Sequence, residues 1–347
     1  MNDSMTDFEM PALFCPIELV QHPQVDLMEK GFIDWMDRLC LAPTAERRQE
    51  LIDIKASVFA AAITPWAPTE RQQWLTNWLY WYWVPDRSSD VGDSSRRTAD
   101  FTRLCFGIDR AISSPGSLRN MTPTQAAAAE GSAAFQRLGT TAQFRRWRDA
   151  QRGFLFGLIH QVANSEQGCM PDVDEYLLQR QITGATLATV PMLEIVSVEE
   201  IPPTVMESPK VRALTEMSAM LVGLDNDIYS HPMEQQPEGN QQNIINVLAF
   251  HQGLTKSAAI ADAVALRDRI MLRFLQLSET VSAREGQPLQ LYVTALRNYV
   301  RANLHLGQNP RYHQYFADGP ETLRITETTE TPSGPLPYPS ISWWWTM

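Results

Sequence analysis

The segment around residue 226 constrains the fold more than any other part of this 347-residue chain. Apolar residues recur just before it at intervals of three and four, at Leu214, Met217, Met220, Leu221 and Leu224. This spacing is typical of an amphipathic helix that packs one face into a core. We therefore expect a long helix to run into residues 224–234.

Three oxygen-bearing side chains follow at helical spacing within this segment. Asn226, Ser230 and Glu234 fall at positions i, i+4 and i+8, which places them on one face of a helix. Such hard oxygen ligands suit magnesium, which keeps several waters and is usually completed by substrate phosphates. The same three residue types also occur on solvated or capping faces, so the pattern by itself leaves both interpretations open.

The pattern Asn-Asp-x-x-Ser-x-x-x-Glu over residues 226–234 resembles the second metal motif of class I terpene synthases, which ionise linear isoprenoid diphosphates. The resemblance implies that Asn226, Ser230 and Glu234 bind metal and that Asn226 also meets the diphosphate. Met233 stands where the family often has lysine. Pro232 removes a backbone donor, so we expect the helix to bend or end near it, which makes Glu234 the ligand in question.

An aromatic segment precedes the other expected ligands. Residues 70–84 predict a helix that ends at Pro85, and its second half is crowded by Trp74, Trp78, Trp81, Tyr82 and Trp83. Such rings suit a large core patch, and they also suit a pocket wall whose π faces stabilise a carbocation. The core interpretation is favoured for any single ring.

Asp86 and Asp90 follow this segment, four residues apart, and could present two carboxylates to a metal. Their place after an aromatic helix and before the Asn226 motif resembles the aspartate-rich motif of the same family. Arg87 replaces the usual second aspartate of that motif. The resemblance implies that Asp86 bridges metal ions and that Asp90 is a further ligand.

Residues 172–183 predict another helix, which carries Arg180 forty-six positions before Asn226. This interval and the string Arg-Gln-Ile-Thr-Gly at 180–184 resemble the family's arginine, linker and glycine arrangement. Arginine offers a forked and permanently charged donor to phosphate, and Gly184 would let the helix break and bare backbone approach the substrate. The resemblance implies that Arg180 senses diphosphate, and that Thr183, Gly184 and Asp86 join it in catalysis.

The C-terminal part of the chain adds a last pair of candidates. Arg311 and Tyr312 follow a predicted helix at 289–306 and resemble an Arg-Tyr pair near the end of family members, which implies that both bind diphosphate. Residues 343–345 are three tryptophans. We expect this aromatic end to dock onto the domain or a partner.

Helical patterns also occur at 25–41, 46–62, 98–112, 133–164, 243–253 and 256–283, with the Ala-rich run 126–134 as a connection, and no convincing strand alternation is present. We predict an all-α, single-domain class I isoprenoid synthase bundle with a central apolar active-site cavity. It would span residues 24–316, between an extended segment at 1–23 and a Pro/Thr/Ser-rich tail at 317–347.

Charge and hydropathy restrict the partners. A formal net charge of −11 argues against a nucleic-acid surface, and it would repel a diphosphate unless cations intervene. No apolar run approaches membrane-spanning length and the N-terminus lacks a signal-peptide core, so we expect a cytoplasmic protein without integral membrane association.

Together with the resemblance, these features predict a magnesium-dependent terpene cyclase, with three Mg²⁺ ions and a homodimer compatible with the family. Its substrate would be farnesyl diphosphate first and geranylgeranyl diphosphate next, cyclised to a hydrocarbon or an alcohol. Two alternatives stay open. A chain-elongating prenyltransferase normally carries two aspartate-rich motifs, and a non-catalytic isoprenoid-binding relative would tolerate Arg87 and Met233.

Overall fold

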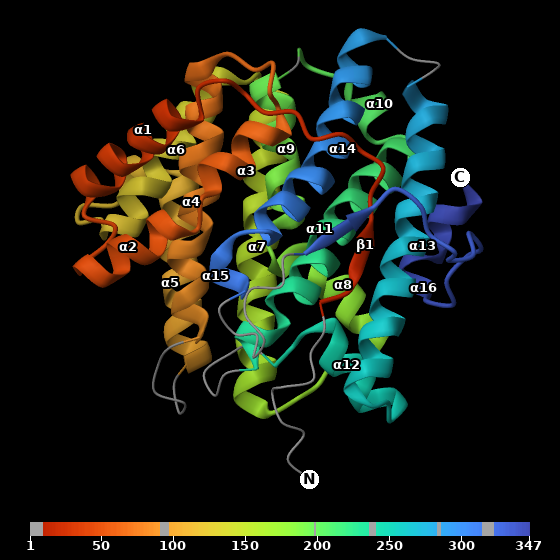
Figure 1. Cartoon of the computed structure of the whole chain (residues 1–347). Helices are drawn as coiled ribbons and strands as arrows, with labels where there is room; N and C mark the ends of the chain where they lie inside the picture. The colour runs from red at the N-terminus through yellow and green to blue at the C-terminus, as the bar shows by residue number, and fades with distance from the viewer. Residues whose placement is uncertain (1–9, 91–96, 198, 236–240, 283–285, 314–322) are drawn as a thin grey trace.

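The computed structural model describes residues 10–90, 97–197, 199–235, 241–282, 286–313 and 323–347. Helices dominate it, which confirms the all-α prediction (Figure 1). The α-helices are α1 (Val25–Leu39), α2 (Ala45–Asp53), α3 (Ala56–Ile63), α4 (Thr69–Asp90), α5 (Arg97–Ser113), α6 (Pro123–Leu138), α7 (Thr141–Gln167), α8 (Val173–Thr183), α9 (Thr186–Ser197), α10 (Pro203–Met206), α11 (Pro209–Glu234), α12 (Ile244–Gln252), α13 (Lys256–Ser282), α14 (Gln287–Gly307), α15 (Pro310–His313) and α16 (Pro339–Ser342). Two short 3₁₀ helices cover Pro115–Ser117 and Trp343–Thr346.

Helix α11 forms the centre of the bundle. It packs against α8, α9, α12, α13, α14 and α15, and Figure 1 shows it between them. Leu214, Met217 and Leu221 are fully buried, so the apolar stripe that predicted this helix does face the core. A helix surrounded in this way holds any polar residues it carries in a fixed position.

Several helix boundaries differ from the sequence prediction. Helix α4 continues through Pro85, because the packing of its buried aromatic turns offsets the cost of a proline in a helix. The Ala-rich run 126–134 lies inside α6 and is not a connection, since alanine is the best helix former and Thr122 supplies a capping box. The expected helix 133–164 divides before Thr140, which caps α7, and 46–62 divides at the left-handed residue Lys55.

The sequence prediction contained neither a two-stranded sheet nor helix α9. Strand β1 (Ala12–Phe14) pairs in parallel with β2 (Arg324–Thr326), with Ala12 opposite Arg324. Strands of three residues are too short for alternation to be recognised, and their partners lie at opposite ends of the chain. Helix α9 was missed because Pro191 lies inside it.

A buried polar network fastens this sheet to the bundle. Arg267 of α13 donates from Nε to Asp225 Oδ1 of α11 at 2.6 Å and from Nη1 to Asp268 Oδ1 at 3.0 Å. Its Nη1 also donates to the backbone oxygen of Phe14 in β1. Asp268 in turn accepts from Thr329 Oγ1 at 2.9 Å, just after β2. Both ends of the chain are therefore linked to the central helix through one arginine.

The aromatic end of the chain docks onto the bundle, as expected. Trp344 is fully buried and donates from Nε1 to Glu216 Oε2 of α11 at 3.1 Å. Arg273 of α13 donates to the backbone oxygen of Trp344 at 2.9 Å. The tail thus contacts α11 at Glu216, before the Asn226 motif, and α13 at Arg273.

The tryptophans of α4 belong to a packed aromatic cluster. Trp78 stacks on Trp81 with ring centroids 4.5 Å apart and meets Trp147 edge-on at 5.0 Å. Both α4 rings are buried, which favours the core interpretation for them.

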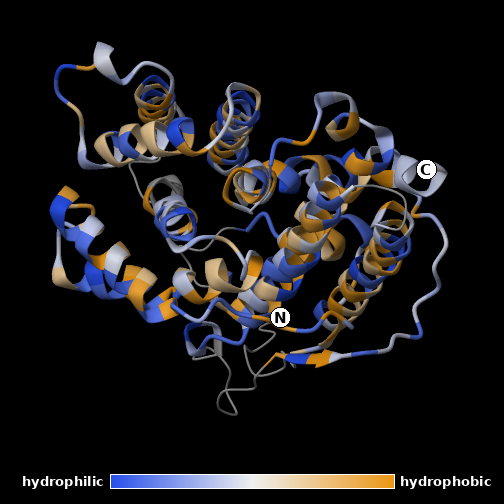
Figure 2. Ribbon diagram, turned by 90° about the horizontal axis from the view of Figure 1, so that it is seen from above, coloured by the Kyte–Doolittle hydropathy of each residue, from blue (hydrophilic) through white to orange (hydrophobic). Residues whose placement is uncertain are grey.

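Figure 2 shows that many helices carry apolar and polar residues on different sides. Within the described ranges, no helix combines the length and apolar character needed to cross a membrane.

Candidate active site

The Asn226, Ser230 and Glu234 side chains lie along the last turns of α11. Ser230 Oγ lies 2.6 Å from Glu234 Oε1 and 2.6 Å from the backbone oxygen of Asn226. Helix α11 passes through Pro232 and ends two residues later, so the expected end near Pro232 is correct. Glu234 nevertheless keeps its place one turn after Ser230, because the helix continues for two residues beyond the proline.

Helix α8 delivers Arg180 directly to this motif. Its Nη2 donates to Asn226 Oδ1 at 2.8 Å and to the backbone oxygen of Gly223 at 3.2 Å, and its Nε donates to Asp227 Oδ1 at 2.7 Å. The guanidinium is almost enclosed, with the side chain 11% exposed. Among the described residues, none accepts a hydrogen bond from the third nitrogen, Nη1. Arg180 therefore contacts the first residue of the Asn226 motif directly.

The break between α8 and α9 follows Thr183, which is buried. Its left-handed residue is Ala185, with φ 57°, whereas Gly184 has an ordinary φ of −83°. The helix thus breaks at Gly184 as expected, although the left-handed conformation falls on the next residue, and the approach of bare backbone to the substrate stays a prediction. A Cβ added at Gly184 would lie 2.2 Å from Arg180 Nη1, so the missing side chain leaves room for the guanidinium.

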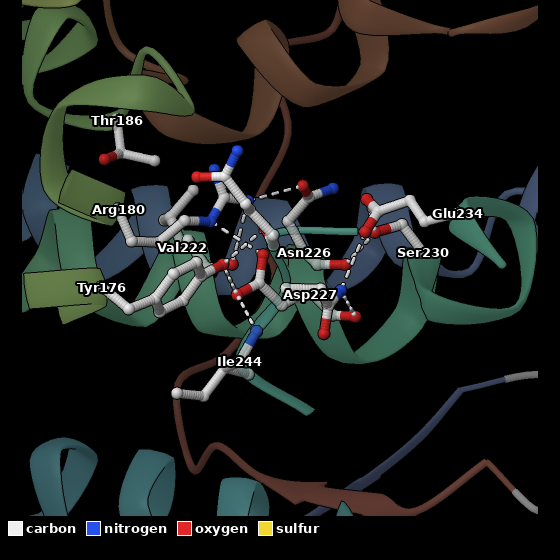
Figure 3. Close-up of polar contacts among 12 residues, drawn as sticks. Tyr176, Arg180, Thr186, Val222, Asn226, Asp227, Ser230, Glu234 and Ile244 are labelled. Carbon is white, nitrogen blue, oxygen red and sulfur yellow. Dashed lines mark hydrogen bonds and ion pairs between the residues drawn. The ribbon is translucent and has the colours of Figure 1, made fainter. Parts of the chain in front are cut away.

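Asp227 is a buried residue of the motif to which sequence reasoning assigned no role. Its Oδ2 accepts from Tyr176 Oη at 2.5 Å and from the backbone N–H of Ile244 at 3.2 Å, and its Oδ1 accepts from Arg180. Figure 3 shows Tyr176, Arg180 and Ile244 converging on it. Burial and the neighbouring Asp227 carboxylate raise the pKa of Tyr176 well above its usual value, so the phenol keeps its proton and donates.

Asn243 is a second residue that was missed. Its Oδ1 caps α12 by accepting from Ile245 N at 3.0 Å. Its Nδ2 donates to Glu234 Oε2 and to the backbone oxygen of Asp227, each at 2.8 Å. An asparagine before an apolar run is a recognisable helix start. No sequence pattern indicates the hydrogen bond from Asn243 to Glu234, because this bond joins the start of α12 to the end of α11.

Tyr312 of α15 reaches the same helix, and Arg311 lies beside Tyr312. Tyr312 is buried and meets the ring of Tyr229 edge-on, with centroids 4.7 Å apart. Tyr229 lies three residues after Asn226 on α11. Arg311 lies over the Tyr312 ring at 5.2 Å, and its Nη1 is buried without a hydrogen-bond partner in the described part of the chain. This guanidinium therefore retains a donor for a ligand.

The two remaining expected ligands, Asp86 and Asp90, lie on the backbone of α4, but the side chains of residues 85–90 lie outside the described residues. In the described ranges, no group of three or more His, Cys, Asp and Glu residues is arranged to hold a metal. Two of the three ligands expected on α11 are of other types, asparagine and serine.

The donor chemistry on α11 fits magnesium. Amide, hydroxyl and carboxylate oxygens are the ligands this ion prefers, and all three lie on one helical face. Burial, with repulsion from Asp227, raises the pKa of Glu234 to about 7, while its hydrogen bonds from Ser230 and Asn243 oppose this rise. A cation beside Glu234 would favour its charged form, so this face is suited to receive one.

Comparisons with known proteins agree with this geometry. Residues 77–273 match the family described as terpene synthase family 2, C-terminal metal binding. Spiroviolene synthase of Streptomyces violens is 32% identical, over 99% of this chain and 98% of that protein. The (+)-T-muurolol synthase of Streptomyces clavuligerus, described as (2E,6E)-farnesyl diphosphate cyclizing, is 30% identical over 96% of this chain and 81% of its own length.

Solved structures show the same architecture. The SVS_A2 protein from ancestral sequence reconstruction superposes with a TM-score of 0.88 at 34% identity, covering 97% of this chain and 99% of that one. The 2-methylisoborneol synthase of Streptomyces coelicolor, solved with Mg²⁺ and 2-fluoroneryl diphosphate, shares the fold with a TM-score of 0.79 at 18% identity, covering 88% and 97%. With this family match and these relatives, the chain belongs to terpene synthase family 2 and is a class I terpene synthase.

Proposed function

We propose that this enzyme is a magnesium-dependent terpene cyclase, which ionises a linear isoprenoid diphosphate and closes the resulting carbocation to a terpene hydrocarbon or alcohol. The contact between Arg180 and Asn226 carries the proposal. It places a guanidinium that can bind diphosphate beside an amide oxygen that can bind magnesium. The farnesyl diphosphate named for the Streptomyces clavuligerus relative and the Mg²⁺ in the 2-methylisoborneol synthase structure support it.

Asn226, Ser230 and Glu234 would hold magnesium from α11, with Asp86 and Asp90 completing a site for three ions from α4. Bound there, Mg²⁺ would supply positive charge to the oxygens of the leaving diphosphate. Asn226 would also contact the diphosphate through this ion cluster. All these side chains offer oxygen ligands, which magnesium prefers, and substrate phosphates usually complete its coordination.

The cationic and phenolic donors act where negative charge develops. Arg180, Arg311 and Tyr312 would donate hydrogen bonds to the departing diphosphate, and such preorganised donors usually make the largest contribution to catalysis. Arg180 and Arg311 each keep one guanidinium nitrogen without a partner among the described residues. Thr183 and Gly184 would border the substrate at the break after α8, and the apolar interior would keep water from the carbocation.

Farnesyl diphosphate is the first candidate substrate and geranylgeranyl diphosphate the second, and a homodimer stays a prediction. The test is to incubate purified protein with geranyl, farnesyl or geranylgeranyl diphosphate and Mg²⁺, and to identify volatile products by mass spectrometry. Cyclic products that disappear with EDTA, and in Asn226→Ala or Ser230→Ala, would support cyclase activity. Elongated diphosphates would indicate a prenyltransferase, and absence of diphosphate release would indicate a binding protein.

A further inference from the structure

Asp227 is next to Asn226 in the sequence but faces a different direction on α11. Successive residues of a helix are rotated by about 100°. The contacts of the Asp227 side chain are accordingly made with α8 and the start of α12, whereas Ser230 and Glu234 lie side by side further along α11 (Figure 3). The motif therefore has a second polar face, that of Asp227, which differs from the face expected to bind metal.

Both carboxylate oxygens of Asp227 are already engaged. Oδ1 accepts from Arg180 Nε at 2.7 Å, and Oδ2 accepts from Tyr176 Oη at 2.5 Å and from Ile244 N at 3.2 Å. The residue is 2% exposed. These three donors come from two different helices, so they fix the carboxylate against rotation.

This arrangement determines the orientation of the Arg180 guanidinium. The Nε and Nη2 edge of the guanidinium is held by Asp227 and Asn226, which leaves Nη1 on the side of Gly184. A guanidinium is planar, so two fixed nitrogens fix the direction of the third. A buried arginine without a carboxylate partner would also be costly, and Asp227 offsets that cost.

We propose that Asp227 is a positioning residue for Arg180, and that Tyr176 holds Asp227 in the orientation that aims Nη1 at the diphosphate. The proposal rests on the proposed function, because it concerns the arginine assigned to diphosphate. It assigns Asp227 to the hydrogen-bonded support of Arg180 and not to the metal ligands.

Asp227→Asn tests the proposal with little change in volume. The carboxylate faces the N–H of Arg180 on one side and that of Ile244 on the other, so an amide must set its own NH₂ group against one of them. We expect affinity for inorganic pyrophosphate in Mg²⁺, measured by calorimetry, to fall about 10–100-fold, the range typical for outer partners of a binding group. Tyr176→Phe removes one donor and should give a smaller loss in the same direction.

A double-mutant cycle separates positioning from a general structural role. In the Arg180→Gln background, Asp227→Asn should change pyrophosphate affinity by no more than about twofold, because its effect passes through the arginine. Asp225→Asn is the matched control, since it alters the neighbouring buried pair with Arg267 and should leave pyrophosphate affinity within about twofold even if the melting temperature falls.

Wild-type affinity in Asp227→Asn, or full additivity with Arg180→Gln, would overturn the positioning role. If Asp227→Asn does not fold, the same cycle with Tyr176→Phe decides the question. A wild-type protein that binds no pyrophosphate and releases none from isoprenoid diphosphates would overturn the proposed function itself, and the positioning role with it.

Discussion

Helix α11 carries Asp225 and Asp227, two residues apart, and each forms a buried pair with an arginine of another helix. The surroundings of the two pairs differ. In the Asp225–Arg267 pair both side chains have zero exposure, and all three guanidinium nitrogens are bonded, to Asp225, Asp268 and the backbone of Phe14. In the pair that Asp227 forms, the Arg180 side chain is 11% exposed. Its Nη1 keeps its hydrogens free among the described residues, next to Gly184.

The comparison shows that burial and pairing alone do not identify a functional ion pair. A pair whose hydrogen-bonding capacity is used up by protein groups can only hold elements together, whereas one with a remaining donor can also bind a ligand. Asp225–Arg267 joins α11, α13 and both chain ends. Asp227–Arg180 joins α11 and α8 and leaves a donor near the expected diphosphate. Four substitutions test this distinction, in order of decreasing expected effect.

Arg267→Met should give the largest change, in stability. Removing one partner leaves the Asp225 carboxylate buried and unpaired, which costs about 3–5 kcal/mol of unfolding free energy. Urea denaturation followed by circular dichroism measures the loss. The double variant with Asp225→Asn should recover part of it, because the orphaned charge is then gone. A loss below about 1 kcal/mol, typical of exposed pairs, would contradict the structural role of this pair.

Arg180→Lys should affect turnover more than stability. Lysine keeps the charge but loses the fork that reaches Asp227 and Asn226 together, so we expect kcat to fall about 100-fold, with a smaller change in KM. Steady-state assays of diphosphate release measure both constants. Arg146→Lys is the matched control, because Arg146 forms a forked pair with Glu194 outside the Asn226 motif. A change confined to KM would contradict a role in ionisation.

Gly184→Ala should lower kcat on the order of 10–100-fold, because a Cβ at this position displaces Arg180 Nη1 from a fixed geometry. The structure thus predicts an effect on diphosphate release, in contrast to the glycine role that the family resemblance implies, which would alter the product mixture. Gly153→Ala is the control, since its added Cβ meets no atom within 4 Å. Unchanged release together with altered products would favour the role implied by the resemblance.

Asn243→Ser should have the smallest effect. Serine still caps α12, but it loses the two donors that reach Glu234 and Asp227. We expect the Mg²⁺ concentration for half-maximal turnover to rise about tenfold, with little change in melting temperature. Asp172→Ser exchanges one cap for another at α8 and should leave the Mg²⁺ dependence unchanged. An equal rise in both variants would show that capping, and not the bond to Glu234, is responsible.

The sequence by itself determined the helices and the local face of the motif. Helix formation depends on residues three and four apart, so the apolar spacing before Leu224 and the spacing of Asn226, Ser230 and Glu234 could be interpreted without knowledge of the fold. The family resemblance added Arg180 as a candidate diphosphate-binding residue, whereas its hydrogen bond of 2.8 Å to Asn226 became known only from the structure.

Tertiary structure decided the partners. Spacing along α11 distinguishes neither Asp225 from Asp227 nor a supporting residue from a ligand, because their roles depend on which side chains α8, α12 and α13 bring to them. The bond from Asn243 to Glu234 and the pairing of β1 with β2 likewise join segments that only packing brings together. Local patterns specify which backbone conformation a segment adopts, whereas contacts between segments exist only after the whole chain has closed around its core.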